Sequence, residues 1–358
     1  MTDPSGSTRA AWLAALVVCA LAVPVSAELV LPPGFTSRVY VSGQGFDRGA
    51  EGGARGIPVA TTLAFDRSGV LYVAKSGNRY GLGEQDSLLS HLYRIPVGGA
   101  WITPASEARH FYGPPLMNAE VGAVGPRGDV FVTTYDPDRK VGVVYRMMDG
   151  RPVLFTGGTP PAGSPPLLAQ PEGVALDASG HVYVADRARD RVVKLDGAGR
   201  VLDPHYLGVP RARMLAIDPP DHLWVGGDGT ADRPWQEGSG QIWRVGPDGR
   251  ARLLFEGPHA AGIDVGPGGA LFVAQRQGGT IFVMTPEGRR LEFAGSAGDT
   301  VPRSLAFAPV TAETQRAGIA GDLFVVTLSP RTWYVNEVIR ISGPFDDFVR
   351  RHGRPAAP

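Results

Sequence analysis

The chain has 358 residues, of which 43% are hydrophobic and 20% charged, and its 35 basic and 35 acidic residues leave a formal net charge of +0. A neutral chain has no basic field that would attract nucleic acid or an anionic membrane, so neither is an expected partner. The single cysteine, Cys19, excludes a framework of disulfides within the chain.

An apolar run over residues 10–25 lies at the start of the chain. The run is too short for a spanning helix, and it ends in Val25-Ser26-Ala27, a pattern of small residues typical of signal-peptide cleavage sites. We therefore predict a signal peptide over residues 1–27, export to the periplasm or the medium, and no membrane attachment after cleavage. Cys19 would leave with the peptide, so the mature chain would contain no thiol.

Two short strand patterns recur along the rest of the chain. The first places an aromatic residue between two aliphatic ones, and its copies lie 41 to 59 residues apart: Leu71-Tyr72-Val73, Val130-Phe131-Val132, Val182-Tyr183-Val184, Leu223-Trp224-Val225, Leu271-Phe272-Val273 and Leu323-Phe324-Val325. The second pattern follows each copy of the first, as in Ile242-Trp243-Arg244-Val245. Self-similarity at this period is typical of a propeller, and six copies predict six blades.

Short turns of Gly, Asp and Pro frame the two patterns. Turns such as Asp177-Ala178-Ser179-Gly180 precede the first, and turns such as Gly246-Pro247-Asp248-Gly249 follow the second. A further strand is expected after the second pattern, for example at 152–155 and 251–255. Each blade is thus predicted to be a four-stranded antiparallel meander, with strands A to D running from axis to rim.

The sixth repeat has strands at 304–308, 323–326 and 338–341, and no fourth strand follows them. The segment Ser37-Arg38-Val39-Tyr40-Val41 has the missing pattern. We predict that it completes the last blade and closes the ring, which removes exposed sheet edges. The predicted fold is all-β: a monomeric six-bladed β-propeller over 28–345, with a C-terminal tail over 346–358 that lies along the rim or is loose.

Loop lengths predict which face carries the function. Because strands alternate in direction, the A–B and C–D turns share one face of the disc, and the B–C and D–A connections share the other. The first class is predicted to be short throughout and the second longer and more variable. Long irregular loops are where binding and catalytic residues tend to lie, so we expect the site on the long-loop face.

The third repeat resembles an NHL repeat. It reads Gln170-Pro171-Glu172-Gly173-Val174-Ala175-Leu176-Asp177-Ala178-Ser179-Gly180-His181-Val182-Tyr183-Val184-Ala185-Asp186, then Arg191-Val192-Val193-Lys194. The other five repeats look like degenerate copies of it. The resemblance implies a six-bladed propeller like those of NHL proteins, gluconolactonases and soluble quinoprotein sugar dehydrogenases. Because these relatives bind proteins or RNA, hydrolyse lactones or oxidise sugars, the resemblance does not select one activity.

Two segments are similar to the sugar (sorbosone-type) dehydrogenases: Leu31-Pro32-Pro33-Gly34-Phe35 and the last repeat, from Gly321 through Trp333 to Ile341. That similarity would imply a quinone cofactor, pyrroloquinoline quinone (PQQ). However, the Asn-His-Asn-Gly-Gly type segment with their catalytic base is missing, and Leu328-Ser329-Pro330-Arg331-Thr332-Trp333 replaces their Gly-Ser-Trp-Asn-Arg segment. These departures argue against quinone binding.

Aligning the repeats on the aromatic strand gives two rings of equivalent positions on the long-loop face. The entry of strand A is occupied by Thr61, Glu120, Glu172, Arg213, Ala261 and Arg303, and the exit of strand B by Lys75, Thr134, Asp186, Gly227, Gln275 and Thr327. The first ring would surround the mouth of the central channel. We expect the functional site at this mouth.

Three carboxylates on adjacent repeats, Glu120, Glu172 and Asp186, are the candidate metal ligands. Cations such as calcium bind several carboxylate oxygens, and the resemblance to gluconolactonases implies a metal that activates the substrate at this mouth. Arg213 and Arg303 are candidate catalytic residues that would stabilise an oxyanion or bind a carboxylate. The alternative is structural: Glu120–Arg303 and Glu172–Arg213 would be ion pairs, and Asp186 would shape a turn.

The remaining candidates come from the same face. His259, two residues before the strand A ring, is a candidate general base. Lys75 and Gln275 of the strand B ring, together with Trp235, Arg331 and Trp333 of the long loops, are candidate ligand-binding residues, because aromatic and planar polar groups suit sugars. The same loops could equally contact a protein.

The sequence therefore predicts an exported propeller that binds a small polar, carbohydrate-like ligand or a partner protein at the long-loop mouth. Two enzyme alternatives remain open: a metal-dependent hydrolase like the gluconolactonases, and a quinone-dependent sugar dehydrogenase. The first alternative requires Glu120, Glu172 and Asp186 on one divalent cation.

Overall fold

The computed structural model describes residues 29–46, 54–75, 89–136, 138–231, 236–297, 300–329 and 335–353. The predicted signal peptide, Cys19 and the loop residues Trp235, Arg331 and Trp333 lie outside these ranges. In the described part of the chain, no helix combines the length and the apolar character needed to cross a membrane.

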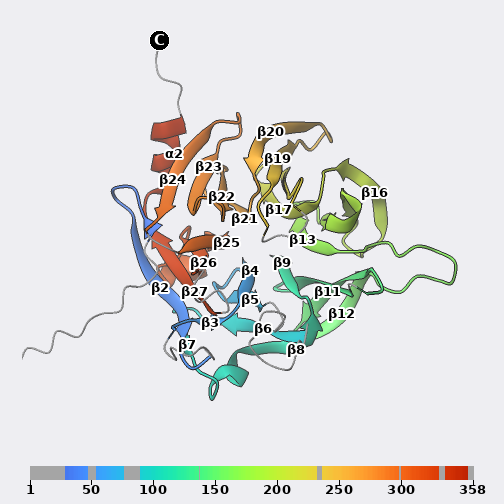
Figure 1. Cartoon of the computed structure of the whole chain (residues 1–358), viewed down its shortest axis with the longest axis horizontal. Helices are drawn as coiled ribbons and strands as arrows, with labels where there is room; N and C mark the ends of the chain where they lie inside the picture. Colours follow the sequence, from blue (N-terminus) through green and yellow to red (C-terminus); the bar gives the residue numbers. More distant parts are fainter. Residues whose placement is uncertain are drawn as a thin grey trace, which may run out of the picture.

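The structure is a ring of six antiparallel sheets, as predicted (Figure 1). Blades one and two contain β4 (Ala60–Phe65), β5 (Leu71–Lys75), β6 (Leu89–Ile95), β8 (Phe111–Met117), and β9 (Glu120–Val124), β10 (Val130–Asp136), β11 (Val141–Met148), β12 (Arg151–Gly157). Blades three and four contain β13 (Pro171–Leu176), β14 (Val182–Asp186), β15 (Arg191–Leu195), β16 (Val201–Gly208), and β17 (Ala212–Asp218), β18 (His222–Gly227), β19 (Ser239–Val245), β20 (Ala251–Pro258). Blade five contains β21 (Gly262–Val265), β22 (Leu271–Gln275), β23 (Thr280–Met284) and β24 (Arg290–Ser296).

Blade six joins the two ends of the ring. Its strands are β25 (Val301–Phe307), β26 (Leu323–Leu328), β27 (Val335–Ser342) and, at the outer position, β2 (Thr36–Gly43). β2 pairs antiparallel with β27, with Arg38 opposite Arg340. Figure 1 shows the N-terminal strand in blue beside the red C-terminal one. The predicted closure of the ring by residues 37–41 is confirmed.

The first strand of each blade lies innermost, and each contacts the first strands of its two neighbours, from β4 through β9, β13, β17 and β21 to β25 and back to β4. These contacts place the entry of every strand A around one axis. The strand B exits lie at the same end of the sheets, since Asp186 is paired with Pro171 and Lys75 with Ala60. The two predicted rings of positions therefore exist in the structure.

The recurring aromatic residue of strand B forms the core of each blade. It is buried in all six: Tyr72, Phe131, Tyr183, Trp224, Phe272 and Phe324. The clusters that contain these rings extend across blade boundaries, and Trp224 of blade four shares one with Ile263 and Leu271 of blade five. Apolar contact between neighbouring sheets thus holds the ring together.

Several short elements were not predicted. β1 (Leu29–Val30) extends the edge of blade five, β3 (Ile57–Pro58) pairs with β27, and β7 (Ala100–Ile102) runs parallel to β2. Two 3₁₀ turns, η1 (Glu107–His110) and η2 (Arg187–Arg189), lie in connections. β7 and η1 occupy residues 96–110, between strands C and D of blade one.

Helix α1 (Ala312–Arg316) lies between strands A and B of blade six, in a connection over residues 308–322. The prediction that all A–B and C–D turns are short is therefore wrong for blades one and six. The segment expected as a tail begins with α2 (Phe345–Gly353), and Phe345 and Phe348 of this helix are buried with Phe35 and Phe293. Burial of two rings fixes this helix beside blade five (Figure 1).

We expect the stability of the ring to depend on the inner face of β2. Val41 is 0% exposed, whereas Val39 on the same strand is 39% exposed. Val41→Ala should lower the free energy of unfolding by about 2 kcal/mol through lost burial and a residual cavity. Val39→Ala, the matched control, should change it by less than about 0.5 kcal/mol. Urea denaturation followed by tryptophan fluorescence measures both, and equal losses would contradict this role of β2.

Candidate functional site

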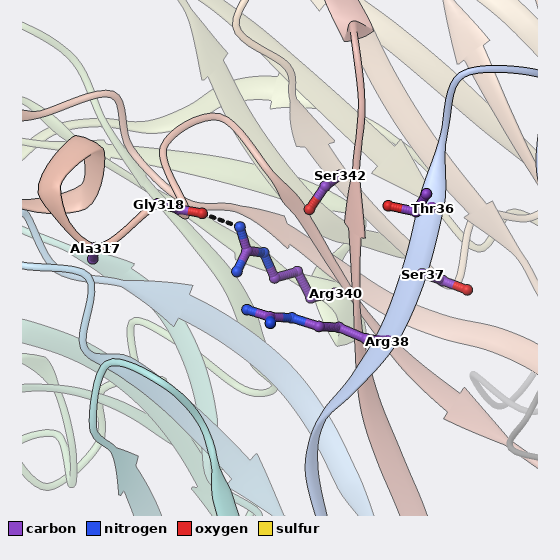
Figure 2. Close-up of a pocket in the computed structure, with 7 residues that line it drawn as sticks. All are labelled: Thr36, Ser37, Arg38, Ala317, Gly318, Arg340 and Ser342. Carbon is purple, nitrogen blue, oxygen red and sulfur yellow. Dashed lines mark hydrogen bonds between the residues drawn. The ribbon is translucent and has the colours of Figure 1, made fainter.

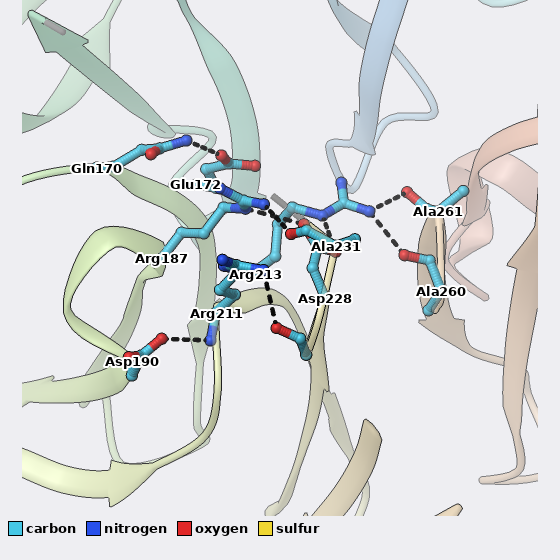
Figure 3. A network of polar contacts seen from close by, with 11 residues as sticks. Gln170, Glu172, Arg187, Asp190, Arg211, Arg213, Asp228, Ala231, Ala260 and Ala261 are labelled. Atoms are coloured by element: carbon cyan, nitrogen blue, oxygen red, sulfur yellow. Dashed lines mark hydrogen bonds and ion pairs between the residues drawn. The ribbon is translucent and has the colours of Figure 1, made fainter. Parts of the chain in front are cut away.

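Glu172, the second residue of the inner strand β13 of blade three, is the buried carboxylate at the centre of the candidate site. It is 7% exposed, and its Oε1 accepts a hydrogen bond of 2.6 Å from Gln170 Nε2 (Figure 3). Burial raises the pKa of Glu172 to about 7, and the positive charge of Arg213 only partly offsets the effect. Glu172 can therefore be a hydrogen-bond donor or an acceptor near neutral pH.

Arg213, from the next inner strand, is fixed by an ion pair that the sequence did not predict. Its Nε donates to Asp228 Oδ1 at 2.7 Å, and its Nη2 donates to the carbonyl of Ala260 at 2.6 Å (Figure 3). Nη1 forms no hydrogen bond with the described residues. Arg213 thus connects blades four and five while keeping one amino group available.

Asp228 holds a second arginine as well. Its Oδ2 accepts a hydrogen bond of 2.8 Å from Nε of Arg187, whose Nη2 donates to the carbonyl of Ala231 at 2.9 Å. Burial by itself would raise the pKa of Asp228, but the charges of Arg213 and Arg187 outweigh it and hold the pKa below its usual range. The carboxylate of Asp228 therefore pairs with two buried guanidinium groups, those of Arg213 and Arg187.

We call these residues the Glu172–Arg213 site: Gln170, Glu172, Arg187, Arg213 and Asp228. The structural alternative predicted an ion pair between Glu172 and Arg213. This prediction is wrong, because Arg213 forms its ion pair with Asp228 instead. Glu172 and Arg213 nevertheless interact electrostatically across the boundary between blades three and four. The site thus combines fixed positive groups with a carboxyl that titrates near neutrality.

The other two predicted metal ligands lie in different surroundings. Glu120 Oε2 accepts a hydrogen bond of 2.9 Å from Thr62 Oγ1 of blade one, and burial raises the pKa of Glu120 despite the charge of Arg303 on β25. Asp186 accepts hydrogen bonds from the backbone of Ala169 and Gln170, at 3.1 and 2.9 Å.

Asp186 also pairs with Arg189 at 3.2 Å, so its carboxylate fixes the loop before β13. Among the described residues, no group of three His, Cys, Asp or Glu side chains comes together in a way that could hold a metal ion. The donor set for a divalent cation on Glu120, Glu172 and Asp186 is thus not assembled in the structure.

The side chains of two predicted ligand-binding residues, Lys75 and Gln275, form contacts with other residues of the ring. Lys75 Nζ forms a 2.8 Å ion pair with Glu107 of η1 and lies 3.8 Å from the centre of the Tyr93 ring. Burial lowers the pKa of Lys75. Gln275 Nε2 donates to the carbonyl of Pro258 at 3.0 Å. Both side chains are thus positioned by the fold.

His259 lies between blades four and five and is 2% exposed. Its backbone N–H donates to the carbonyl of Gly238 at 3.3 Å, and a Cβ on Gly240 would come within 2.5 Å of the His259 Cα. Glycine is therefore required at 240 for this close approach. The structure places His259 in the packing of the loop, and its predicted role as a base stays a prediction.

Sequence reasoning missed Gln170, Arg187 and Asp228 as parts of the site. The sequence contained one indication that Asp228 belongs to the site. Asp228 directly follows Gly227, a member of the strand B ring, and the pairing of Gly227 with Ala212 brings Asp228 beside Arg213. Arg187 follows Asp186 in the same way in blade three. The residues after the strand B ring, rather than those in it, complete the site.

Comparison with known proteins agrees with this architecture. Residues 168–195 match the family model of the NHL repeat. The matched segment covers the first three strands of blade three and contains Gln170, Glu172 and Arg187 of the site. The five other blades repeat the fold of blade three. No match was found among curated proteins.

Solved propellers share the fold at low sequence identity. A gluconolactonase from Xanthomonas campestris is similar with a TM-score of 0.57 and 15% identity, over 90% of this chain and 99% of that one. A putative oxidoreductase (glucose dehydrogenase) from Thermus thermophilus has a TM-score of 0.56 and 16% identity, over 86% and 100%. The PQQ-bound aldose sugar dehydrogenase of Streptomyces coelicolor has a TM-score of 0.56 and 14% identity, over 87% and 99%. The likeness establishes a common fold.

We expect the buried carboxyl of Glu172 to make stability depend on pH. Its pKa is about 7 in the folded chain and near 4.5 in the unfolded one, so the folded state binds the proton more tightly. The contribution of Glu172 to stability is therefore fully present below pH 4.5, and up to about 3 kcal/mol of it is lost as the pH rises through 7.

In Glu172→Gln the side chain at position 172 cannot ionise. The variant should therefore be more stable than the native chain at pH 8, and this difference in the free energy of unfolding should vanish towards pH 4.5. Urea denaturation at pH 5 and pH 8 measures this effect. Glu313→Gln, at an exposed position, is the control and should follow the native profile. A native-like pH profile for Glu172→Gln would show that Glu172 is ionised throughout.

Proposed function

We propose that this chain binds a small polar, carbohydrate-like ligand at the Glu172–Arg213 site, on the long-loop side of the ring. The observation that supports this most directly is the buried carboxyl of Glu172, with a pKa of about 7, beside a rigidly held arginine. Small-molecule sites commonly combine a few positioned polar groups with perturbed titratable residues. A partner protein remains the alternative occupant.

The chemistry of the groups matches vicinal hydroxyls. Glu172 Oε2 forms no hydrogen bond with the described residues, and neither does Arg213 Nη1, so both atoms can bind a ligand. A carboxylate accepts two hydrogen bonds from neighbouring hydroxyls, and a guanidinium donates to ring and hydroxyl oxygens. Because Asp228 fixes Arg213, little side-chain entropy would be lost on binding.

Two cofactor-dependent alternatives receive less support from the described residues. The donor set for a cation is not assembled, and the sequence lacks the segment that carries the catalytic base in the quinoprotein dehydrogenases. The described residues therefore do not fit a divalent cation, and quinone chemistry rests on fold similarity alone. Neither a metal nor PQQ is part of the binding proposal.

Ligand binding can be tested by thermal unfolding with glucose, gluconate and glucono-1,5-lactone at constant ionic strength. These probes follow from the glucose dehydrogenase and gluconolactonase among the similar structures. A probe at 100 times its dissociation constant should stabilise the chain by about 2.7 kcal/mol. Glu172→Gln should remove the shift, while Glu313→Gln should keep it. No shift with any probe, or one that survives Glu172→Gln, would contradict the proposal.

The near-neutral pKa of Glu172 also favours a second candidate function, lactone hydrolysis. Ionised Glu172 would accept a proton from water as the water oxygen attacks the carbonyl carbon, and Arg213 would stabilise the resulting oxyanion. The protonated Glu172 would then return the proton to the ring oxygen as the acyl C–O bond breaks. This cycle consumes one water and needs no other reactant.

Hydrolysis predicts that kcat/KM for glucono-1,5-lactone rises with pH through about 7, as the carboxyl ionises. Glu172→Gln should lower kcat at least 100-fold, because the group that accepts the proton from water is lost. Acid release in a pH-stat, corrected for spontaneous opening, measures the rate. Turnover unchanged in Glu172→Gln would exclude this mechanism, whereas binding without turnover would leave the binding proposal intact.

A further inference from the structure

A cavity of about 410 Å³ opens on blade six at the short-loop end of the strands, opposite the end that carries the Glu172–Arg213 site. It is lined by Thr36, Ser37, Arg38, Ala317, Gly318, Arg340 and Ser342. Two of its walls are β2 and β27, the strands that close the ring, and the third is the chain that follows α1 (Figure 2). The unexpectedly long A–B connection of blade six therefore builds this cavity.

Cross-strand register gathers two arginines and two hydroxyls on one face. Thr36 is opposite Ser342, and Arg38 is opposite Arg340. Because side chains alternate along a strand, Thr36 and Arg38 share a face, as do Arg340 and Ser342. Figure 2 shows both guanidinium groups side by side and directed towards Gly318, with Ser37 turned the other way.

Arg340 is fixed and already balanced. It is 8% exposed, and its guanidinium donates to the carboxylate of Asp322 and to the carbonyl of Gly318. Ser342 Oγ donates to the same Asp322 carboxylate at 2.7 Å. This arrangement gives the cavity a rigid cationic wall with its polar atoms in defined positions.

The positive charge of Arg38 is not paired with a carboxylate of the described residues. Its side chain is exposed, and no hydrogen bond or ion pair joins it to another described residue. Like charges directly opposite each other on neighbouring strands repel. Among the described residues, nothing offsets the positive charge of Arg38 at the mouth of the cavity.

The repeats provide an internal comparison for this position. In blade two the cation of strand C, Arg146, lies opposite Val153, and in blade three Lys194 lies opposite Asp203. In blade four Arg244 lies opposite Arg252, but Arg252 donates to the carbonyl of Glu287 in the next blade at 3.1 Å. Blade six differs from blade four because its outer arginine, Arg38, forms no hydrogen bond with another described residue and instead lines a cavity.

We propose that this cavity binds a small polar ligand that carries an oxyanion group, a carboxylate or a phosphate. Arg38 pairs with the anion in bidentate geometry, and the guanidinium of Arg340, held by Asp322 and Gly318, lies beside that pair. The hydroxyls of Thr36 and Ser342 bind the polar remainder of the ligand. The volume falls within the range of ordinary small-molecule sites and accommodates a molecule of monosaccharide size.

The location gives the ligand a structural consequence. An anion held between Arg38 and Arg340 bridges the first and the last strand of the ring. Because it binds the closed ring and not a chain with β2 detached, it shifts the equilibrium towards closure. This site is independent of the Glu172–Arg213 site.

Isothermal titration at constant ionic strength tests the proposal with two probes, inorganic phosphate and glucuronate. At least one anion should bind, and the tighter of the two identifies the anionic group. Arg38→Gln, at an exposed position, should weaken binding at least tenfold while the variant stays folded. Arg252→Gln, the matched control from blade four, should bind the anion as the native chain does.

Hydrogen exchange supplies a second readout. The anion should slow amide exchange in β2 and β27 of the native chain and should leave Arg38→Gln unchanged. Anion binding that is equal in the native chain and Arg38→Gln, or absent for both anions, would overturn the proposal. Loss of binding in Glu172→Gln instead would assign the anion to the other site.

Discussion

The pairing of β2 with β27 is the contact on which the rest of the structure depends. A sheet of four strands buries its faces only against neighbouring sheets, so a ring of six blades has no free face once it is closed. The closing strand comes from the opposite end of the chain, and its Val41 is fully buried. Every inner strand is positioned by this closure, since each contacts the next around the axis.

Closure of the ring buries charged side chains where the inner strands begin. Arg213 and Arg187 are buried there with one shared carboxylate, Asp228. Burying an ionised group without a partner costs free energy, and burial therefore raises the pKa of Glu172. Asp228 lies between two arginines, whose charges hold its pKa below the usual range and keep it ionised. The difference between these two carboxyls, set by their partners rather than by their type, gives the site a group that changes charge near neutral pH.

The two faces of the ring carry two different candidate sites. The Glu172–Arg213 site lies between blades and uses residues that follow strand ends, whereas the cavity on blade six uses the face of a paired strand. In blades two, four and six an arginine of strand C pairs with an aspartate near the short-loop face, as in Arg146–Asp129, Arg244–Asp218 and Arg340–Asp322. In blade six the closing strand β2 adds Arg38 opposite Arg340, and Arg38 forms no hydrogen bond or ion pair with another described residue.

The sequence alone determined the number of blades, their four-stranded form and the strand that closes the ring, since these follow from local periodicity repeated along the chain. It also located Glu172 and Arg213 at one end of the inner strands. Only the tertiary structure decided their partners: Arg213 pairs with Asp228, and Asp186 binds the backbone of its own loop. Side-chain pairing across blades depends on the directions of loops, which no repeat encodes, and the cavity on blade six arises from an insertion found in one blade only.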